Sequence, residues 1–194
     1  KSGYFQNRLM SKKQDFSGRL VLSENPTLNI DEAEVPEEFM WTTYKAHLIR
    51  NLIKKGYTYA EAEKAILEKK PAAKQALAEE SERVPIIVNR NPTLLKSNLI
   101  SLKAIPSHTS TLNINPLTFK GLAADVDGDQ VNIYVPMTPQ AVAEAKEKLS
   151  PKNNILDFRR GPGGGSLSAP SHEAVLGAHY LTTPDELKQP VKFK

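Results

Sequence analysis

The chain has 194 residues, enough for one large domain or for a domain with helical appendages. Its 26 Lys and Arg against 22 Asp and Glu give a net charge of +4, a mild basic bias that permits a polyanionic partner without requiring one. The absence of cysteine excludes disulfides and thiolate zinc sites. No apolar run approaches the roughly 18 residues that cross a membrane, so we expect a cytoplasmic protein with no membrane partner.

The N-terminal residues 1–35 predict a basic lead-in followed by the first strand. Lys12, Lys13 and Arg19 give this segment its basic character. The run GRLVLS is rich in β-forming residues, and the turn-forming sequence ENPT follows it. We therefore expect one strand here.

Residues 36–82 predict a helical block. The stretch PEEFMWTTYKAHLIRNLIKKG starts with proline and two glutamates and ends at Gly56, which is typical of one continuous helix. Thr58 and Glu61 have the spacing of a capping box ahead of a second helix. Pro71 then opens a third, alanine-rich helix.

Residues 83–136 predict strands, in the runs VPIIVNR, NLISLKAI, STLNI and VNIYV. Because strands lie on both sides of the helical block, that block is best interpreted as an insertion into one β-structure. Residues 137–194 predict further helices around a glycine-rich loop. Thr138 is the expected cap of the first of these helices and Ser171 the cap of the last.

The stretch AADVDGDQ places three aspartates, Asp125, Asp127 and Asp129, at a spacing of two. An extended segment would point all three carboxylates to one side, where they repel one another unless a cation binds. Mg²⁺ and Ca²⁺ both select carboxylate oxygens. A calcium loop of the EF-hand type is excluded because Gln130 and Pro136 stand where it needs Gly and Glu. A solvated acidic turn and a catalytic Mg²⁺ site remain open.

The stretch AADVDGDQ resembles the NADFDGDQ signature of the largest catalytic subunit of multisubunit DNA-dependent RNA polymerases, the bacterial β′ subunit. Other blocks of that family have similar counterparts in the same order, namely KKQDFSGR, PIIVNRNPTLLK, VPMTPQAVAEAKEKLSPKNNIL and APSHEAVLGAHYLTT. Together they cover roughly residues 1–183. The departures from the family pattern suggest a divergent polymerase, such as one encoded by a large bacteriophage.

The resemblance implies an α+β fold, a double-psi β-barrel with a helical insertion and C-terminal helical segments. It also implies that Asp125, Asp127 and Asp129 hold the catalytic Mg²⁺, which bridges the RNA 3′-hydroxyl and the incoming α-phosphate. The expected partners are the DNA template, the RNA product, a β-like subunit that carries a second barrel, and other polymerase subunits.

Two further expectations follow from the resemblance. Asn89 and Arg90 lie in the block that reaches the nucleotide. The alternatives are that Asn89 caps the turn before Pro92 and that Arg90 is an ordinary surface arginine. Lys12, Lys13 and Arg19 match basic positions beside the nucleic acid.

One position departs from the family pattern. Ala123 replaces the family asparagine, so the amide expected to contact the ribose 2′-hydroxyl is missing. Sugar selection must then come from other groups or be weaker.

Two rival functions stay open at this point. The D-x-D-G-D loop is shared by single-chain or RNA-templated polymerases that contain two barrels. A non-catalytic nucleic-acid-binding module on the same barrel is the other alternative. The intact aspartates favour catalysis, because a retired site has no need to keep three mutually repelling carboxylates.

Overall fold

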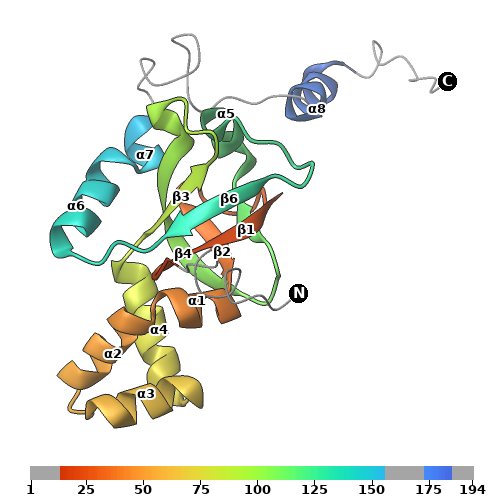
Figure 1. The fold of residues 1–194 in the computed structure, drawn as a ribbon. Helices are drawn as coiled ribbons and strands as arrows, with labels where there is room; N and C mark the ends of the chain where they lie inside the picture. The colour runs from red at the N-terminus through yellow and green to blue at the C-terminus, as the bar shows by residue number, and fades with distance from the viewer. Residues whose placement is uncertain (1–13, 156–172, 185–194) are drawn as a thin grey trace, which may run out of the picture.

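The computed structural model describes residues 14–155 and 173–184. Within them, six strands close into a barrel in the order β1-β5-β2-β4-β3-β6 (Figure 1). The strands are β1 (Ser17–Glu24), β2 (Glu32–Pro36), β3 (Ile86–Arg90), β4 (Leu99–Ser107), β5 (Leu112–Ile114) and β6 (Gln130–Tyr134). Closure pairs every one of these strands on both sides, so no strand edge is left open among them.

The barrel mixes parallel and antiparallel pairs. β1 runs parallel to β5, and β2 runs parallel to β4. The remaining pairs, β1–β6, β2–β5, β3–β4 and β3–β6, are antiparallel. This closed barrel with its helices confirms the predicted α+β fold, a double-psi β-barrel with a helical insertion and C-terminal helical segments.

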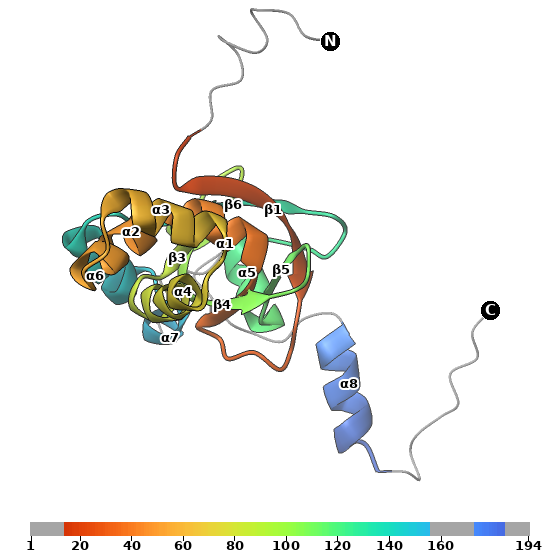
Figure 2. The same ribbon diagram turned by 90° about the horizontal axis from the view of Figure 1, so that it is seen from below.

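The helices lie outside the barrel. Four of them, α1 (Glu37–Thr43), α2 (Lys45–Lys54), α3 (Tyr59–Leu67) and α4 (Pro71–Arg83), connect β2 to β3, and the later ones are α5 (Phe119–Leu122), α6 (Pro139–Lys148), α7 (Pro151–Asn154) and α8 (Glu173–Thr182). Short 3₁₀ turns, η2 (Lys96–Asn98) and η3 (Pro116–Thr118), precede β4 and α5. Figures 1 and 2 show α1–α4 gathered at one end of the barrel, while Figure 1 shows α5 at the opposite end. No helix within the described ranges is long and apolar enough to span a membrane.

One hydrophobic core fills the barrel and extends into the insertion. The alternation that the pleat of a strand produces is clear in β6, where Val131 and Ile133 are buried and their neighbours are more exposed. Fully buried members include Leu22, Val35, Val88, Leu102 and Ile133 from the strands and Met40, Leu48 and Leu52 from the insertion. The insertion therefore folds against the barrel rather than as a separate unit.

The capping predictions are confirmed where the structure describes them. The Glu61 backbone N–H donates to Thr58 Oγ1 at 3.3 Å, and the Thr58 N–H donates to a Glu61 carboxylate oxygen at 2.9 Å. The Ala141 N–H donates to Thr138 Oγ1 at 3.2 Å at the start of α6. The predicted cap Ser171 lies outside the described residues.

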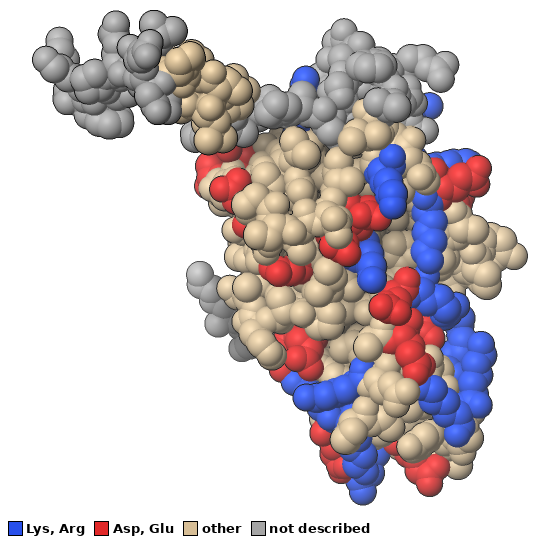
Figure 3. All heavy atoms as spheres, turned by 180° about the vertical axis from the view of Figure 1, so that it is seen from behind, with Lys and Arg blue, Asp and Glu red and all other residues tan. Residues whose placement is uncertain are grey.

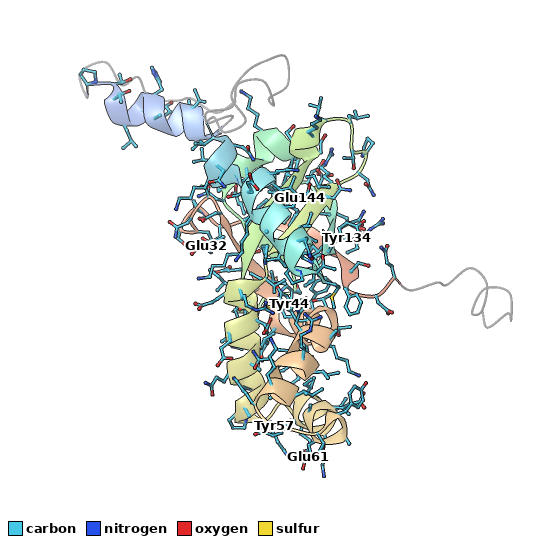
Figure 4. The ribbon with its side chains drawn as sticks, turned by 90° about the vertical axis from the view of Figure 1, so that its left-hand side faces the viewer. Glu32, Tyr44, Tyr57, Glu61, Tyr134 and Glu144 are labelled. Atoms are coloured by element: carbon cyan, nitrogen blue, oxygen red, sulfur yellow. The ribbon has the colours of Figure 1, made fainter. Side chains whose placement is uncertain are left out.

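The single continuous helix predicted after Pro36 is wrong, because the segment divides at Tyr44 into α1 and α2. The two halves have different packing partners: α1 packs on β1, β2 and β4, whereas α2 packs on α3 and α4. The buried Tyr44 hydroxyl donates to the Val84 carbonyl at 2.8 Å. Figure 4 shows Tyr44 where the insertion meets the barrel.

Strand β2 was not expected from the sequence. Its residues EAEVP include two glutamates, which are poor strand formers. The structure satisfies Glu34 by long-range contacts, because its two carboxylate oxygens accept hydrogen bonds from Asn25 at 3.2 Å and Asn113 at 2.9 Å. Those partners lie on other parts of the barrel and cannot be read from the local pattern.

Gly18, in the D-F-S-G-R segment, has a packing role. A Cβ at this position would overlap the ring of Phe39, which belongs to α1. The missing side chain therefore allows the insertion to lie directly against β1.

His47 joins the insertion to the end of the barrel. Its Nε2 donates to the Pro136 carbonyl at 3.0 Å, and its Nδ1 lies 3.8 Å from a carboxylate oxygen of Glu80. The side chain is buried, and this burial lowers the pKa of His47, while the hydrogen bond to Pro136 partly opposes the shift. Among the charged neighbours, Glu80 raises the pKa, and Arg50 and Arg83 lower it.

We predict that His47 makes stability depend on pH. Because folding lowers the pKa of His47, the unfolded chain binds more protons, and the free energy of unfolding must fall as the pH drops below the ordinary histidine range near about 6.5. His47→Gln should reduce this loss in urea unfolding measured between pH 7.5 and 5. The exposed His108 provides the control, and His108→Gln should leave the slope unchanged. Equal slopes for His47→Gln and the unsubstituted chain would contradict the prediction.

Candidate metal centre and nucleotide site

The three aspartates lie on the loop that joins α5 to β6. α5 ends at Leu122, and β6 begins at Gln130, directly after Asp129. Figures 1 and 2 show this connection on the side of the barrel away from α6 and α7. Residues 125–128 are exposed, so the loop lies at an accessible rim of the barrel.

The loop is a turn and not an extended segment. Residues 126–128 form the turn, and Gly128 has a φ of 102°, a left-handed conformation that glycine adopts without strain. The expectation that a spacing of two points all three carboxylates to one side by strand geometry is therefore wrong. The glycine of the D-x-D-G-D motif is needed here because it lets the chain reverse before β6.

Ala123 begins this loop in a strained conformation. It terminates α5 with φ 51° and ψ 42°, the left-handed region that asparagine and glycine tolerate better than alanine. The departure noted at this position thus has a backbone consequence as well as the loss of a side-chain amide.

Asn98 positions the helix that leads into the loop, and sequence analysis missed it. Its buried amide donates to the Leu122 carbonyl at 2.9 Å and approaches the Gly121 carbonyl at 3.4 Å. Its side-chain oxygen accepts from the Leu95 N–H at 2.8 Å. Asn98 thereby ties the segment after the N-R-N-P block to the last carbonyls of α5, a contact between residues 24 positions apart that no local pattern reveals.

Asp129 has the most contacts of the three aspartates. Arg90 donates to it through two nitrogens, Nε to Oδ2 at 2.7 Å and Nη2 to Oδ1 at 3.3 Å. The Asp125 N–H donates to the same Oδ2 at 3.0 Å. The Asp129 carbonyl accepts from the Leu22 N–H of β1 at 2.8 Å, so this residue joins β1, β3 and the loop.

These contacts set the charge of Asp129. The hydrogen bond from Arg90 lowers the pKa of the Asp129 carboxyl, the Asp125 N–H and the Arg90 charge lower it further, and partial burial opposes the shift. Asp129 is therefore an ionised carboxylate paired with a guanidinium, and such forked charge-assisted contacts are among the stronger hydrogen bonds in proteins.

Asp125 and Asp127 are exposed, and Asp125 Oδ1 accepts from the Val126 N–H at 2.8 Å. The donor chemistry fits Mg²⁺, since three carboxylates lie within five residues. In the part of the chain that the structure describes, no three His, Cys, Asp or Glu side chains are arranged as a group that could hold a metal ion. Asp129 instead faces Arg90, so a shared cation requires a rearrangement of these side chains.

The two residues expected at the nucleotide differ in their contacts. Arg90, at the end of β3, reaches the aspartate loop. Asn89 faces its own turn, because its amide donates to Asn91 Oδ1 at 3.3 Å and its Oδ1 accepts from Thr93 Oγ1 at 2.8 Å. The structure thus brings Arg90 together with the aspartates and gives Asn89 a role in shaping the turn.

Arg19 lies on β1, on the insertion side of the strand and away from the aspartate loop. Its Nε donates to Asn132 Oδ1 at 3.1 Å. Leu22, whose N–H donates to the Asp129 carbonyl, lies three residues after Arg19. Three residues span about 10 Å along a strand. Arg19 also borders an open cavity of about 880 Å³ between β1, β6 and the insertion, together with Tyr59 and Tyr134. Lys12 and Lys13 lie outside the described residues.

The charged surface is mixed. Figure 3 shows Lys and Arg close to Asp and Glu over much of the face that it presents. Lys45 pairs with Glu63 and Lys55 with Glu79, each at 2.7 Å. The modest net charge therefore does not by itself identify a nucleic-acid surface.

Comparison with known proteins now adds to this geometry. The family described as RNA polymerase Rpb1, domain 2, matches residues 63–150, which contain Arg90 and all three aspartates. The "DNA-directed RNA polymerase subunit beta'" of Sulfurimonas denitrificans is 35% identical over 184 residues, and that of Aliarcobacter butzleri is 34% identical over 188. The corresponding subunit of Campylobacter jejuni is 34% identical over 184 residues.

The chain is similar to bacterial β′ subunits. The three alignments cover 94% to 96% of it, so the likeness extends well beyond the aspartate loop. The β′-like chain spans only 12% of the length of each of these relatives.

We predict that the strain at Ala123 lowers the stability of the β′-like chain. Ala123→Gly should raise the free energy of unfolding by about 1 kcal/mol, because glycine adopts the left-handed conformation without the Cβ clash. The matched control is the next residue, Ala124, whose φ is not positive. Ala124→Gly should lower stability, since it adds chain entropy to the unfolded state and removes a partly buried methyl group. Urea unfolding of the two variants measures the difference, and a loss of stability in Ala123→Gly would contradict it.

Proposed function

We propose that this chain is the catalytic-barrel portion of the β′-like subunit of a DNA-directed RNA polymerase. The observation that supports this most directly is the identity of 34% to 35% to β′ subunits over almost the whole chain, which includes a D-x-D-G-D loop at the barrel rim. The proposed reaction is nucleotidyl transfer, in which the RNA 3′-hydroxyl attacks the α-phosphate of a nucleotide and pyrophosphate leaves. A bacteriophage origin stays a prediction.

In this proposal, Asp125, Asp127 and Asp129 supply the oxygen ligands for Mg²⁺. When bound, the cation would neutralise charge on the α-phosphate and lower the pKa of the attacking hydroxyl. Three carboxylates suit this task because Mg²⁺ prefers hard oxygen ligands and keeps further positions for water and phosphate.

Arginines of the barrel strands would bind the other parts of the substrates. Arg90 adjoins the aspartate loop, and in this proposal its guanidinium contacts the incoming nucleotide, for which planar forked donors are well suited. Arg19, about 10 Å away along β1, would contact the phosphate backbone of the nucleic acid. Lys12 and Lys13 are proposed to add to this contact.

The described rim supplies only part of a polymerase site. Phosphoryl transfer depends on positioning and on charge neutralisation from several directions, whereas this rim offers three carboxylates and Arg90. We therefore propose that the chain acts with a β-like subunit that carries a second barrel, with other polymerase subunits, and with the DNA template and RNA product.

We predict that Asp127→Ala in the complete polymerase lowers the rate of RNA primer extension by about a thousandfold or more. Loss of a metal ligand removes several kcal/mol of charge stabilisation in the transition state. Asp127 is exposed in the turn and supports no part of the barrel core, so assembly and template binding should be retained.

The matched control is Asp31→Ala, which removes an aspartate that lies outside the loop. The Asp31 backbone carbonyl accepts from the Lys103 N–H, and this hydrogen bond does not involve the side chain. That variant should extend RNA at the unsubstituted rate. Substantial extension by Asp127→Ala would rule out the proposed metal site. A loss of template binding along with activity would show instead that Asp127 acts through structure.

A further inference from the structure

The ion pair between Arg90 and Asp129 links the residue proposed for the nucleotide to a residue proposed for the metal. Their side chains are 26% and 21% exposed, so the pair is largely removed from water. Its two nitrogen–oxygen contacts, at 2.7 and 3.3 Å, form a fork. Such a partly buried, charge-assisted fork is stronger than the usual exposed ion pair.

The carboxylate of Asp129 is already well supplied with donors. Its Oδ2 accepts from both Arg90 Nε and the Asp125 N–H, and its Oδ1 accepts from Arg90 Nη2. A carboxylate offers about four lone-pair sites, so a cation could join only beside the guanidinium. There the two positive groups would repel each other across a few ångströms in a partly desolvated site. Arg90 thus acts as the counter-ion of Asp129 in the described structure.

The other two aspartates differ in this respect. Among the described residues, no Lys or Arg forms an ion pair with Asp125 or Asp127. Both are exposed and open to a cation, whereas Asp129 would have to exchange the Arg90 guanidinium for the cation. The three carboxylates of the loop therefore differ in their contacts, and among the described residues they do not form a group that could hold a metal ion.

We propose that Arg90 and the divalent cation compete for Asp129, so that cation binding releases the Arg90 guanidinium toward the nucleotide. This inference rests on the proposed function and adds an order to its steps. Because coupling between two ligands is reciprocal, a nucleotide that draws Arg90 away from Asp129 also raises the affinity of the loop for the cation. The site is then completed only when both are present.

The test is a titration of the full 194-residue chain with Mn²⁺ alone, in which electron paramagnetic resonance measures the free ion. Arg90→Gln should bind Mn²⁺ about three- to tenfold more tightly than the unsubstituted chain, since the competing charge is gone. Arg90→Lys, which keeps the charge but loses the fork, should show a smaller gain. In an Asp129→Asn background, Arg90→Gln should have no further effect, because the shared carboxylate charge is absent.

Lys120 provides the charge-matched control. It lies on α5, five residues before Asp125, and forms no ion pair among the described residues. Lys120→Gln removes the same unit charge close to the loop and should change the Mn²⁺ affinity less than twofold. If Lys120→Gln raised the Mn²⁺ affinity as much as Arg90→Gln does, the effect would come from the loss of any nearby positive charge. That result would overturn the competition for Asp129.

Two further outcomes separate the inference from the proposed function. If Asp127→Ala abolishes Mn²⁺ binding but Arg90→Gln binds no more tightly than the unsubstituted chain, the metal site stands and the competition is wrong. If Asp127→Ala leaves Mn²⁺ binding unchanged, the ion does not bind at this loop, and both the proposed metal site and the competition are wrong.

Discussion

The double pairing of β6 is the constraint on which the candidate site depends. β6 pairs with β1 on one side and with β3 on the other, which fixes Arg19 opposite Asn132 and Arg90 opposite Val131. Because the aspartate loop runs directly into β6, the same register brings Asp129 to Arg90, although 39 residues separate them in sequence. The chemistry proposed for this rim therefore requires a closed barrel, and any slip of β6 would separate the groups.

The helical insertion supports this arrangement from the other end of the barrel. Tyr44 and His47 connect it to Val84 and Pro136, the residues that flank the barrel strands β3 and β6. Gly18 lets α1 lie against β1. The insertion is thus attached to all three strands that carry the site, so a loss of its packing should disturb the rim even though no insertion residue belongs to the proposed site.

Local chemistry made part of this structure predictable. The capping box at Thr58, the cap at Thr138 and most of the barrel strands follow from residue types at short spacing. The break at Tyr44 and the strand β2 could not be predicted, because each depends on partners far away in sequence. The same reason hides the Arg90–Asp129 pair and the buried amide of Asn98. Sequence pattern identified the carboxylates, but only the closed barrel shows that Arg90 pairs with Asp129 and that Asn98 holds the end of the helix before the loop.

The central claim is that the three aspartates share one divalent cation at the barrel rim. Anomalous diffraction at the manganese edge, from crystals of the chain grown with Mn²⁺, tests it most directly. The account predicts one peak about 2.1 Å from carboxylate oxygens of Asp125, Asp127 and Asp129, with the Arg90 guanidinium turned away from Asp129. A loop without a peak at saturating Mn²⁺, or a peak held by other residues while Arg90 still pairs with Asp129, would contradict it.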